Sequence, residues 1–379
     1  MNKVPFSLPA KCPDEIENLL SSVNSGMVVG DGPYTKAAQQ LLSEQLSSKG
    51  EVLLTTSCTH ALEMAAILLE IRLGDEVIVP SYTFVSSALS FHMRGAKIVF
   101  ADIKSDTLNI DVSVVERLIT NRTRAIVAVH YGGVACDMDA LIELAARHDI
   151  DVIEDNAHGL YGKYRDQYLG SIGSIATQSF HGTKNLSCGE GGALIVNKEK
   201  LFDRAKIIRE KGTNRSQFLE GKVDKYTWVD EGSSYVMSDI LASLLYSQLN
   251  HAGRIQQKRK RIWDTYEREL SSWATDFNIA TPFIPSHCSQ SYHLFYLLFP
   301  NQSNRDHFIS FMAERGVETA SHYQPLHSSS YALRFTDSSA QDCPVTTQIS
   351  NTIVRLPLFA DMSEEQQDYV LESAQEYGC

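Results

Sequence analysis

Asp155 and Lys184 are the two residues whose positions in the sequence most favour chemistry. Asp155 follows the apolar run Asp151–Glu154, so we expect it at the carboxyl end of a buried strand, where open α/β sheets bind ligands. Lys184 follows the apolar run Ile175–Phe180 in the sequence SFHGTKNL, and apolar surroundings can lower a lysine pKa and make the amine a nucleophile for carbonyl carbons. Taken singly, Asp155 could cap a helix and Lys184 could be a solvated loop residue. The two together favour an active site.

Hydroxyl-bearing residues and aromatic residues follow two further apolar runs. The segment Thr55–His60 (TTSCTH) precedes a helical pattern, and the backbone amides at such a helix start can bind an anion. Ser57 or Thr59 as a simple helix cap is compatible with that interpretation. Tyr82 and Phe84 come within reach of the same sheet edge, and we expect one of the two to be a core residue. An anion site, an aromatic plate, a carboxylate and a lysine at one edge are what pyridoxal phosphate requires.

Short apolar runs alternate with helical patterns between about residues 50 and 200. Strands that are apolar on both faces are typical of a sheet covered by helices on each side, so the pattern predicts an α/β protein with a mostly parallel sheet. The predicted strands are Val52–Thr55, Glu76–Val79, Lys97–Ala101, Ala125–His130, Asp151–Glu154, Ile175–Phe180 and Ala193–Val196. The predicted helices are Thr59–Ile71, Phe84–Met93, Val112–Ile119 and Asp137–His148.

The pattern changes after residue 200, where a second, smaller α/β domain is expected. The polar, Gly-containing stretch Gly212–Ser234 predicts an ordered functional loop, and Ser238–Leu270 predicts one long helix connecting the domains. We therefore expect a large domain over 1–250 and a small domain over 251–379. The other predicted elements are the helices Asp203–Arg209, Arg305–Arg315 and Glu364–Glu376 and the strand His293–Phe299.

Composition excludes several classes of protein. The chain has 379 residues, of which 43% are hydrophobic and 21% charged, and its net charge is 34 − 46 = −12. An acidic chain is a poor binder of nucleic acid or anionic membranes, and the basic run Lys258–Arg261 is interpreted as a solvated helix face. No apolar run suggests a membrane span or a secretory signal, and the seven cysteines form no C-x-x-C pair that would indicate a metal site or a disulfide framework. We expect a cytoplasmic enzyme.

The sequence resembles the nucleotide-sugar aminotransferases of the DegT/DnrJ/EryC1/StrS family, within the aspartate-aminotransferase fold (pyridoxal-phosphate fold type I). The resemblance runs nearly end to end, over GDGPYT (30–35), TSCT (56–59), GDEVIVPSYTFVS (74–86), EDNAH (154–158), SFHGTKN (179–185), GEGGA (189–193), HYQPLH (322–327) and LPL (356–358). Three further segments are similar to the branch that makes dTDP-4-amino-4,6-dideoxygalactose: REKGTNRSQF (209–218), DKYTW (224–228) and GSSYVMSD (232–239).

The resemblance implies a role for each matching residue. Lys184 matches the lysine that binds pyridoxal phosphate covalently, and Asp155 matches the acid that keeps the pyridinium nitrogen protonated. Val236 stands where many relatives carry an asparagine that contacts the cofactor phosphate in the partner subunit. Whether this chain makes such a contact between subunits is left open. His158 stands where many relatives carry glutamine, near the ring hydroxyl. The other residues that match cofactor contacts are Ser57, Cys58, Thr59, Phe84 and Ser179.

The resemblance also implies a reaction and partners. A homodimer with shared active sites would transfer the amino group of L-glutamate to dTDP-4-keto-6-deoxy-D-glucose through pyridoxamine phosphate, as in O-antigen synthesis for lipopolysaccharide. Asn214 and Arg215 in the 212–216 loop, with His322 and Tyr323, are expected to line the sugar-nucleotide site. Alternatives within the family are a carbon-3 ketone or an equatorial amine. A dehydratase would carry histidine in place of Lys184. A regulatory protein without catalysis would not need to retain Asp155, Ser179 and Lys184 together.

Overall fold

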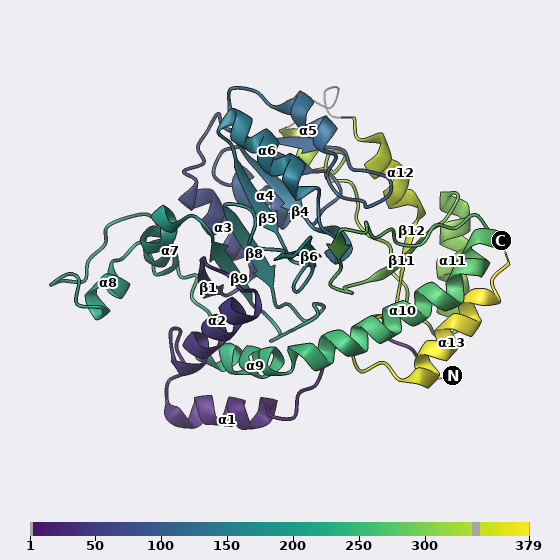
Figure 1. Cartoon of the computed structure of the whole chain (residues 1–379), viewed down its shortest axis with the longest axis horizontal. Helices are drawn as coiled ribbons and strands as arrows, with labels where there is room; N and C mark the ends of the chain where they lie inside the picture. Colours follow the sequence, from purple (N-terminus) through teal and green to yellow (C-terminus); the bar gives the residue numbers. More distant parts are fainter. Residues whose placement is uncertain (1–2, 336–341, 379) are drawn as a thin grey trace.

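A central sheet organises the larger part of the chain in this computed structural model, which describes residues 3–335 and 342–378. Among the described residues, seven strands form this sheet, and β9 runs antiparallel to both of its neighbours while the remaining neighbouring pairs are parallel (Figure 1). The predicted α/β fold and all seven predicted strands are confirmed. In sheet order they are β1 (Glu51–Thr55), β9 (Gly192–Val196), β8 (Ile175–Ser179), β5 (Asp151–Asp155), β4 (Thr123–Val129), β2 (Glu76–Pro80) and β3 (Lys97–Ala101).

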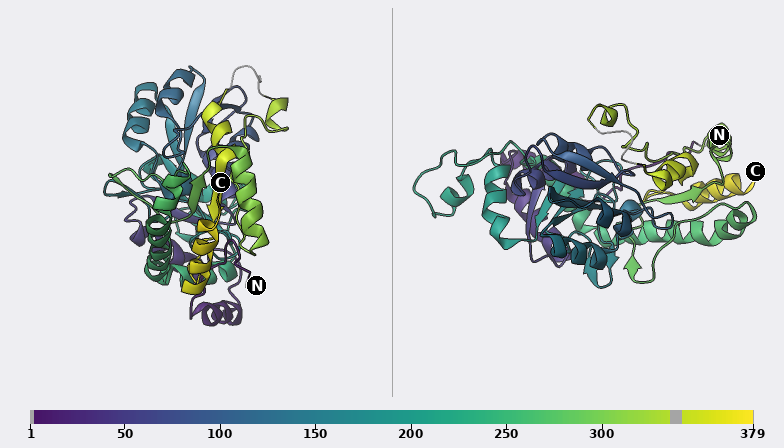
Figure 2. Two further views of the ribbon diagram at one scale, coloured as in Figure 1. Left: turned by 90° about the vertical axis from the view of Figure 1, so that its right-hand side faces the viewer. Right: turned by 90° about the horizontal axis from the view of Figure 1, so that it is seen from above.

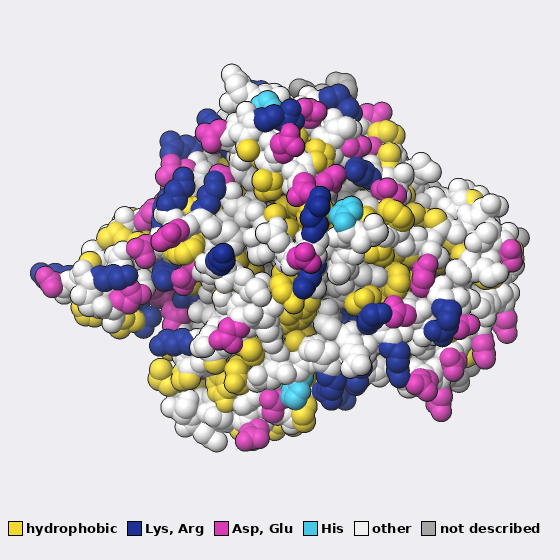
Figure 3. Space-filling model, viewed as in Figure 1, with side chains coloured by type: hydrophobic (Ala, Val, Ile, Leu, Met, Phe, Trp, Pro, Cys, Tyr) yellow, Lys and Arg dark blue, Asp and Glu magenta, His cyan; other side chains and the backbone are white. Residues whose placement is uncertain are grey.

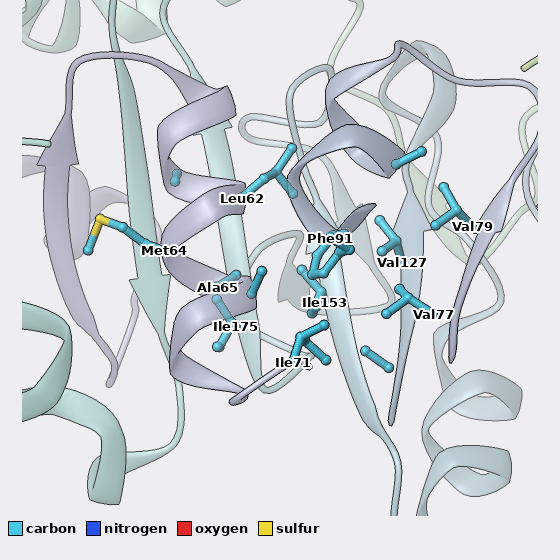
Figure 4. Packing of buried hydrophobic residues seen from close by; sticks show 14 of the residues in the cluster. Leu62, Met64, Ala65, Ile71, Val77, Val79, Phe91, Val127, Ile153 and Ile175 are labelled. Carbon is cyan, nitrogen blue, oxygen red and sulfur yellow. The ribbon is translucent and has the colours of Figure 1, made fainter. Parts of the chain in front are cut away.

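Helices cover both faces of this sheet because alternate strand residues point to opposite sides. Val77 and Val127 pack toward α3 and α4, as Figure 4 shows, whereas Ile78 and Ile126 belong to the cluster on the other face. Each fully buried side chain of this size contributes about 1.5–3 kcal/mol to stability. One face carries α3 (Cys58–Leu68), α4 (Ser86–His92) and α7 (Phe202–Arg209), and the other carries α2 (Pro33–Gln45), α5 (Val112–Leu118), α6 (Met138–His148) and α9 (Asp239–Asn250).

A second core lies in the C-terminal part, on the right of Figure 1 (see also Figure 2). The antiparallel pair β11 (Phe295–Leu298) and β12 (Ile353–Leu356) packs with the helices around it. Val4 joins the same core and bridges to Val317, so the segment around Val4 packs with the C-terminal part. We propose a domain boundary near residue 250. We also propose that the N-terminal segment around Val4 belongs to the C-terminal domain. The helices of this part are α10 (Ala252–Asp276), α11 (Gln302–Glu314), α12 (Pro344–Thr352) and α13 (Glu364–Gln375).

The prediction of one continuous helix over Ser238–Leu270 was wrong. Two helices, α9 and α10, meet at His251, whose φ of −104° and ψ of 11° leave the helical range. The His251 Nε2 atom lies 3.0 Å from Asp14 Oδ1, so a tertiary contact holds the chain at this break. A leucine-rich periodicity continues across such a break, and therefore periodicity alone did not reveal it.

The segment between α7 and α9 extends away from the body of the molecule (Figures 1 and 2). It contains the short helix α8 (Arg215–Leu219), and a bridge between Thr213 and Trp228 closes it into an ordered loop. Outside this segment, the elements that were not predicted include the helices α1 (Glu15–Ser25), α2 and α12, the strand β12 and a small sheet. That sheet has the order β10 (Cys288–Ser289), β6 (Lys163–Tyr164) and β7 (Gln167–Tyr168).

Candidate active site

A cavity of about 570 Å³ lies at the carboxyl ends of the sheet strands, against the C-terminal part. Strand ends and helix starts of the large sheet line one side, and His322, Tyr323 and Arg355 line the other. Most residues that the sequence predicted for the site lie in this wall. They are Ser57, Cys58, Thr59, Phe84, Asp155, His158, Ser179, Lys184, His322 and Tyr323.

The start of α3 forms an anion cradle at one end of the cavity. Ser57 is the N-cap, and its Oγ accepts a hydrogen bond from the His60 amide at 3.1 Å. The first hydrogen bond of the helix runs from Ala61 N to Ser57 O, so the amides of Cys58 and Thr59 have no acceptor within the helix. Gly192 of β9 allows close packing here, since a Cβ atom at this position would lie 2.4 Å from Cys58 N. These backbone amides and the hydroxyl groups suit a phosphate.

Asp155 is fixed at the carboxyl end of β5. Its side chain is buried, its Oδ2 accepts a hydrogen bond from Ser87 Oγ at 2.6 Å, and its Oδ1 accepts one from Ala157 N at 3.2 Å. Ser87 was not predicted, because a serine within a run of small helical residues carries no signal of its own. A buried carboxylate that faces the cavity and is oriented by two donors can hold a positive charge on a ligand.

The neighbouring residue, Glu154, serves the fold. It points to the opposite side of β5, is fully buried, and contacts His130 Nε2 at 3.0 Å. Its carboxylate also accepts hydrogen bonds from the amides of Gly170 and Gly173, which fixes the loop before β8. Two adjacent positions of the strand thus place one carboxylate in the core and the next one at the cavity.

Lys184 has an amine suited to nucleophilic and proton-transfer chemistry. Burial, with a smaller contribution from the charge of Arg355, lowers its pKa to about 8 against the opposing effects of Cys58 and Asp155. Burial raises the pKa of the Cys58 thiol to about 12, so that group is uncharged near neutral pH. A considerable fraction of Lys184 is therefore neutral near pH 8, which an attacking amine or a general base requires.

His158 is held as a neutral hydrogen-bond donor. Its Nδ1 accepts a hydrogen bond from the Gly132 amide at 3.3 Å, which assigns the proton to Nε2, and Nε2 lies 3.2 Å from the Tyr323 hydroxyl. Burial, with the charges of Lys184 and Arg355, holds the pKa of His158 well below its usual value. The ring stacks on His293 with centroids 4.2 Å apart, a contact that the sequence did not reveal.

The two aromatic residues that follow β2, Tyr82 and Phe84, lie in different environments. Tyr82 is buried with 1% of its surface exposed, and its hydroxyl donates to the backbone oxygen of His322. Phe84 lines the cavity and is 57% exposed, so its ring is available for stacking. This division confirms the expectation that one of the pair is a core residue.

Asn214 and Arg215 do not line this cavity. The Asn214 side chain accepts a hydrogen bond from Thr227 N at 2.7 Å and donates one to Lys225 O at 3.2 Å, which stabilises the extended loop. Arg215 begins α8 in the same loop. Their assignment to a sugar-nucleotide site stays a prediction and requires a cavity on a second subunit. Val236 is bridged to Thr55 of its own chain.

Arg355 is a charged lining residue that the sequence analysis missed. It stands in β12, where a single arginine between apolar residues carries no signal, yet the fold places it in the wall of the same cavity as Lys184. Over the described parts of the chain, no group of three or more His, Cys, Asp or Glu residues is placed to hold a metal ion. No helix in those same parts is long and apolar enough to cross a membrane.

The sheet, with its anion cradle, carboxylate and lysine at one edge, defines a fold type I pyridoxal-phosphate enzyme. The chain belongs to the DegT/DnrJ/EryC1/StrS aminotransferase family, whose model matches residues 10–375. The spore coat polysaccharide biosynthesis protein SpsC of Bacillus subtilis is 31% identical over 98% of this chain and 96% of its own.

Solved structures agree with this assignment. Spr1654 of Streptococcus pneumoniae, known in PLP, PMP and apo forms, superimposes with a TM-score of 0.90 at 28% identity, over 99% of this chain and, for the PLP form, 98% of its own. The aminotransferase TlmJ of Streptoalloteichus hindustanus has a TM-score of 0.89 at 27% identity, over 98% of both chains. The protein is a pyridoxal-phosphate-dependent aminotransferase.

The residues of the cavity fit this cofactor. The cradle at α3 suits the phosphate, the exposed face of Phe84 suits the ring, and the buried carboxylate of Asp155 suits a protonated pyridine nitrogen. Lys184, with its lowered pKa, has the amine that would bind the aldehyde group. When bound, the cofactor carries the amino group between substrates and stabilises negative charge on the carbon that loses a proton.

Proposed function

We propose that the protein transfers the amino group of L-glutamate to dTDP-4-keto-6-deoxy-D-glucose, giving 2-oxoglutarate and dTDP-4-amino-4,6-dideoxy-D-galactose. The observation that carries the substrate assignment is the sequence of the extended loop, over 209–218, 224–228 and 232–239, which resembles the branch that makes this product. A site whose polar groups must match particular hydroxyls discriminates strongly, so loop sequence can follow substrate. The same proposal places the product among precursors of lipopolysaccharide O-antigen and the enzyme in the cytoplasm.

Names of relatives support a sugar substrate in general. SpsC is named for polysaccharide biosynthesis, and Spr1654 bears the name of a sugar aminotransferase. In each half-reaction the residues of this chain do the same work. Lys184 would move a proton to or from the carbon that carries nitrogen, Asp155 would hold the positive charge of a protonated ring nitrogen, and neutral His158 would donate a hydrogen bond.

The substrate assignment is tested by incubating the purified enzyme with glutamate and the 4-keto sugar nucleotide. We expect an axial amine at carbon 4, which the ring couplings in the NMR spectrum of the product identify. An equatorial amine would move the assignment to the glucose-configured product. Turnover of a 3-keto sugar nucleotide, without reaction of the 4-keto compound, would refute it.

We further propose that the working unit is a homodimer with shared active sites. The loop that carries Asn214 and Arg215 extends away from its own cavity, and the space-filling view in Figure 3 shows it as the projection on the left. The helix α1 presents a second apolar surface, at spacing typical of one helix face. The exposed apolar residues of the two regions are Phe218, Leu219, Tyr226, Trp228 and Val229 in the loop, and Ile16, Leu20 and Val23 in α1.

Mixing two inactive variants tests the shared site. Lys184→Ala and Arg215→Ala subunits each carry one defect, and a mixed dimer contains one site free of both. After equal mixing with random exchange, about one quarter of all sites should be intact, so activity should return to about one quarter of the wild-type value. Sedimentation velocity should show a dimer. A fully active monomer, or mixing without any recovery, would contradict the proposal.

A further inference from the structure

His293 connects the C-terminal part of the chain to the turn that carries Lys184. It lies just before β11, is buried, and lines the cavity together with Lys184. Its Nδ1 atom lies 2.8 Å from Oδ1 of Asn185, the residue that follows Lys184. Its ring also stacks on the His158 ring, with centroids 4.2 Å apart and an angle of 27° between the planes. One imidazole therefore contacts both the Lys184 turn and the His158 ring.

The hydrogen bonds around Asn185 assign the proton of the His293 ring. The Asn185 Nδ2 group donates to Ser291 O at 2.7 Å and to Gln256 Oε1 at 3.1 Å. A backbone oxygen can only accept, so Asn185 Oδ1 is the remaining acceptor and the Nδ1–H group of His293 donates to it. Burial holds the pKa of His293 well below its usual value, so the ring is neutral and keeps this tautomer near neutral pH.

The backbone of His293 is in turn fixed by Arg259 of α10. The Arg259 side chain is buried and donates to the backbone oxygens of Tyr292, at 3.0 Å, and of His293. Arg259 belongs to the basic run Lys258–Arg261, and the interpretation of that run as a solvated helix face is wrong for this residue. Its guanidinium instead holds His293 at a defined place in the C-terminal part.

We propose that His293 is a positioning residue for Lys184, acting through Asn185. Proton transfer requires the amine to meet the reacting carbon in a fixed geometry, and a displacement of about 1 Å can cost about 100-fold in rate. The Lys184 side chain is long, so the place of its amine depends on the place of its backbone. Three hydrogen bonds on the next side chain hold that backbone against the C-terminal part. This inference rests on the proposed proton transfer by Lys184 but not on the identity of the sugar.

Two substitutions of His293 separate its hydrogen bond from its ring contact. His293→Phe keeps a flat ring against His158 but removes the donor to Asn185, whereas His293→Asn keeps an amide donor near the Nδ1 position but removes the ring. Conversion of the aldehyde form of the enzyme to the amine form by L-glutamate can be followed by absorbance without any sugar present. At saturating glutamate we expect this rate to fall roughly 10- to 100-fold in His293→Phe and to stay within about threefold of the wild-type value in His293→Asn.

A deuterium isotope effect identifies the step that is slowed. With glutamate deuterated at the α-carbon, the isotope effect on this half-reaction should be larger in His293→Phe than in the wild type, because proton transfer then limits the rate. A loss of stability alone would not change it. His92→Phe is the matched control, since His92 also stacks on an aromatic ring, with its centroid 4.0 Å from that of Phe335, and does not line the cavity. It should leave the rate and the isotope effect unchanged.

Covalent trapping gives a readout that does not depend on turnover. In cofactor-free enzyme supplied with pyridoxal phosphate and borohydride, Lys184 should be labelled roughly 10-fold more slowly in His293→Phe than in the wild type, because its amine is misplaced. Asn185→Leu tests the same hydrogen bond from its other end and also serves if His293→Phe does not fold. The double variant should be no slower than Asn185→Leu alone, since both changes remove one shared interaction.

Three outcomes would overturn the inference. One is a folded His293→Phe enzyme, with unchanged circular dichroism, that keeps the wild-type rate and isotope effect. Another is an equal loss in His293→Phe and His293→Asn, which would show that the hydrogen bond to Asn185 is not the cause. The third is a slower rate with an unchanged isotope effect, which would indicate a step other than proton transfer. Trapping at another lysine in the wild-type enzyme would refute the role of Lys184 itself. Failure of the 4-keto sugar as acceptor, with the donor results as expected, would refute the substrate assignment alone.

Discussion

Replacing Lys184 with alanine should remove catalysis almost completely. In the proposed reaction the amine would both bind the cofactor aldehyde and transfer the proton, and the cavity offers no other lysine among its lining residues. Loss of a positioned acid–base group alone costs about 10²–10⁴-fold, so we expect turnover to fall by about 10⁴-fold or more. The exposed Lys200, changed to alanine, should leave turnover unchanged and serves as the matched control.

Covalent trapping gives this prediction a readout apart from activity. In cofactor-free enzyme supplied with pyridoxal phosphate, borohydride should fix the cofactor on Lys184, as peptide mass spectrometry would identify. The neutral amine is the reactive form, so the labelling rate should rise with pH and reach half its maximum near pH 8, the value to which burial lowers the Lys184 pKa. Exposed lysines, with pKa values near about 10.4, should label more slowly at that pH. Trapping at a different lysine would remove the assignment.

The change Asp155→Asn should cost on the order of 10³-fold in turnover. It keeps the shape of the side chain but removes the negative charge that favours a protonated ring nitrogen, and electrostatic stabilisation of this kind is worth several kcal/mol. The deficit should appear in both half-reactions, since the ring is common to them. Rates near those of the wild type would show that another group supplies the charge.

Ser87→Ala provides a graded comparison for Asp155. Ser87 Oγ donates to Asp155 Oδ2 at 2.6 Å, so its loss removes orientation without removing charge. We expect a decrease of roughly 10- to 100-fold, about what one hydrogen bond to a charged group contributes. A loss as large as that of Asp155→Asn would mean that orientation, and not charge, dominates.

The sheet and much of the cavity wall could be predicted from the sequence because both depend on local pattern. Runs such as Val77–Val79 are apolar on both faces, and residues that follow such runs, among them Asp155 and Lys184, must lie at a common sheet edge. Predicting each strand therefore also predicted where the side chain that follows it would lie.

Features that depend on distant contacts were not predictable in this way. Arg355 reaches the cavity only because β12 pairs with β11 and the C-terminal part packs against the sheet edge. The break at His251 is accompanied by a contact with Asp14, and the stacking of His293 on His158 joins residues far apart in the chain. No local periodicity records such pairings.

During synthesis, the two halves of the phosphate cradle leave the ribosome at different times. Ser57 and Cys58 emerge early, whereas Gly192, which packs against them, belongs to β9. In the sheet order β9 separates β1 from β8, so β1 has no strand to pair with until residue 192 is available. At translation rates of about 5–20 residues per second this interval lasts on the order of ten seconds. For that time the apolar strand β1 must be shielded from wrong partners, and the nascent chain cannot retain the cofactor.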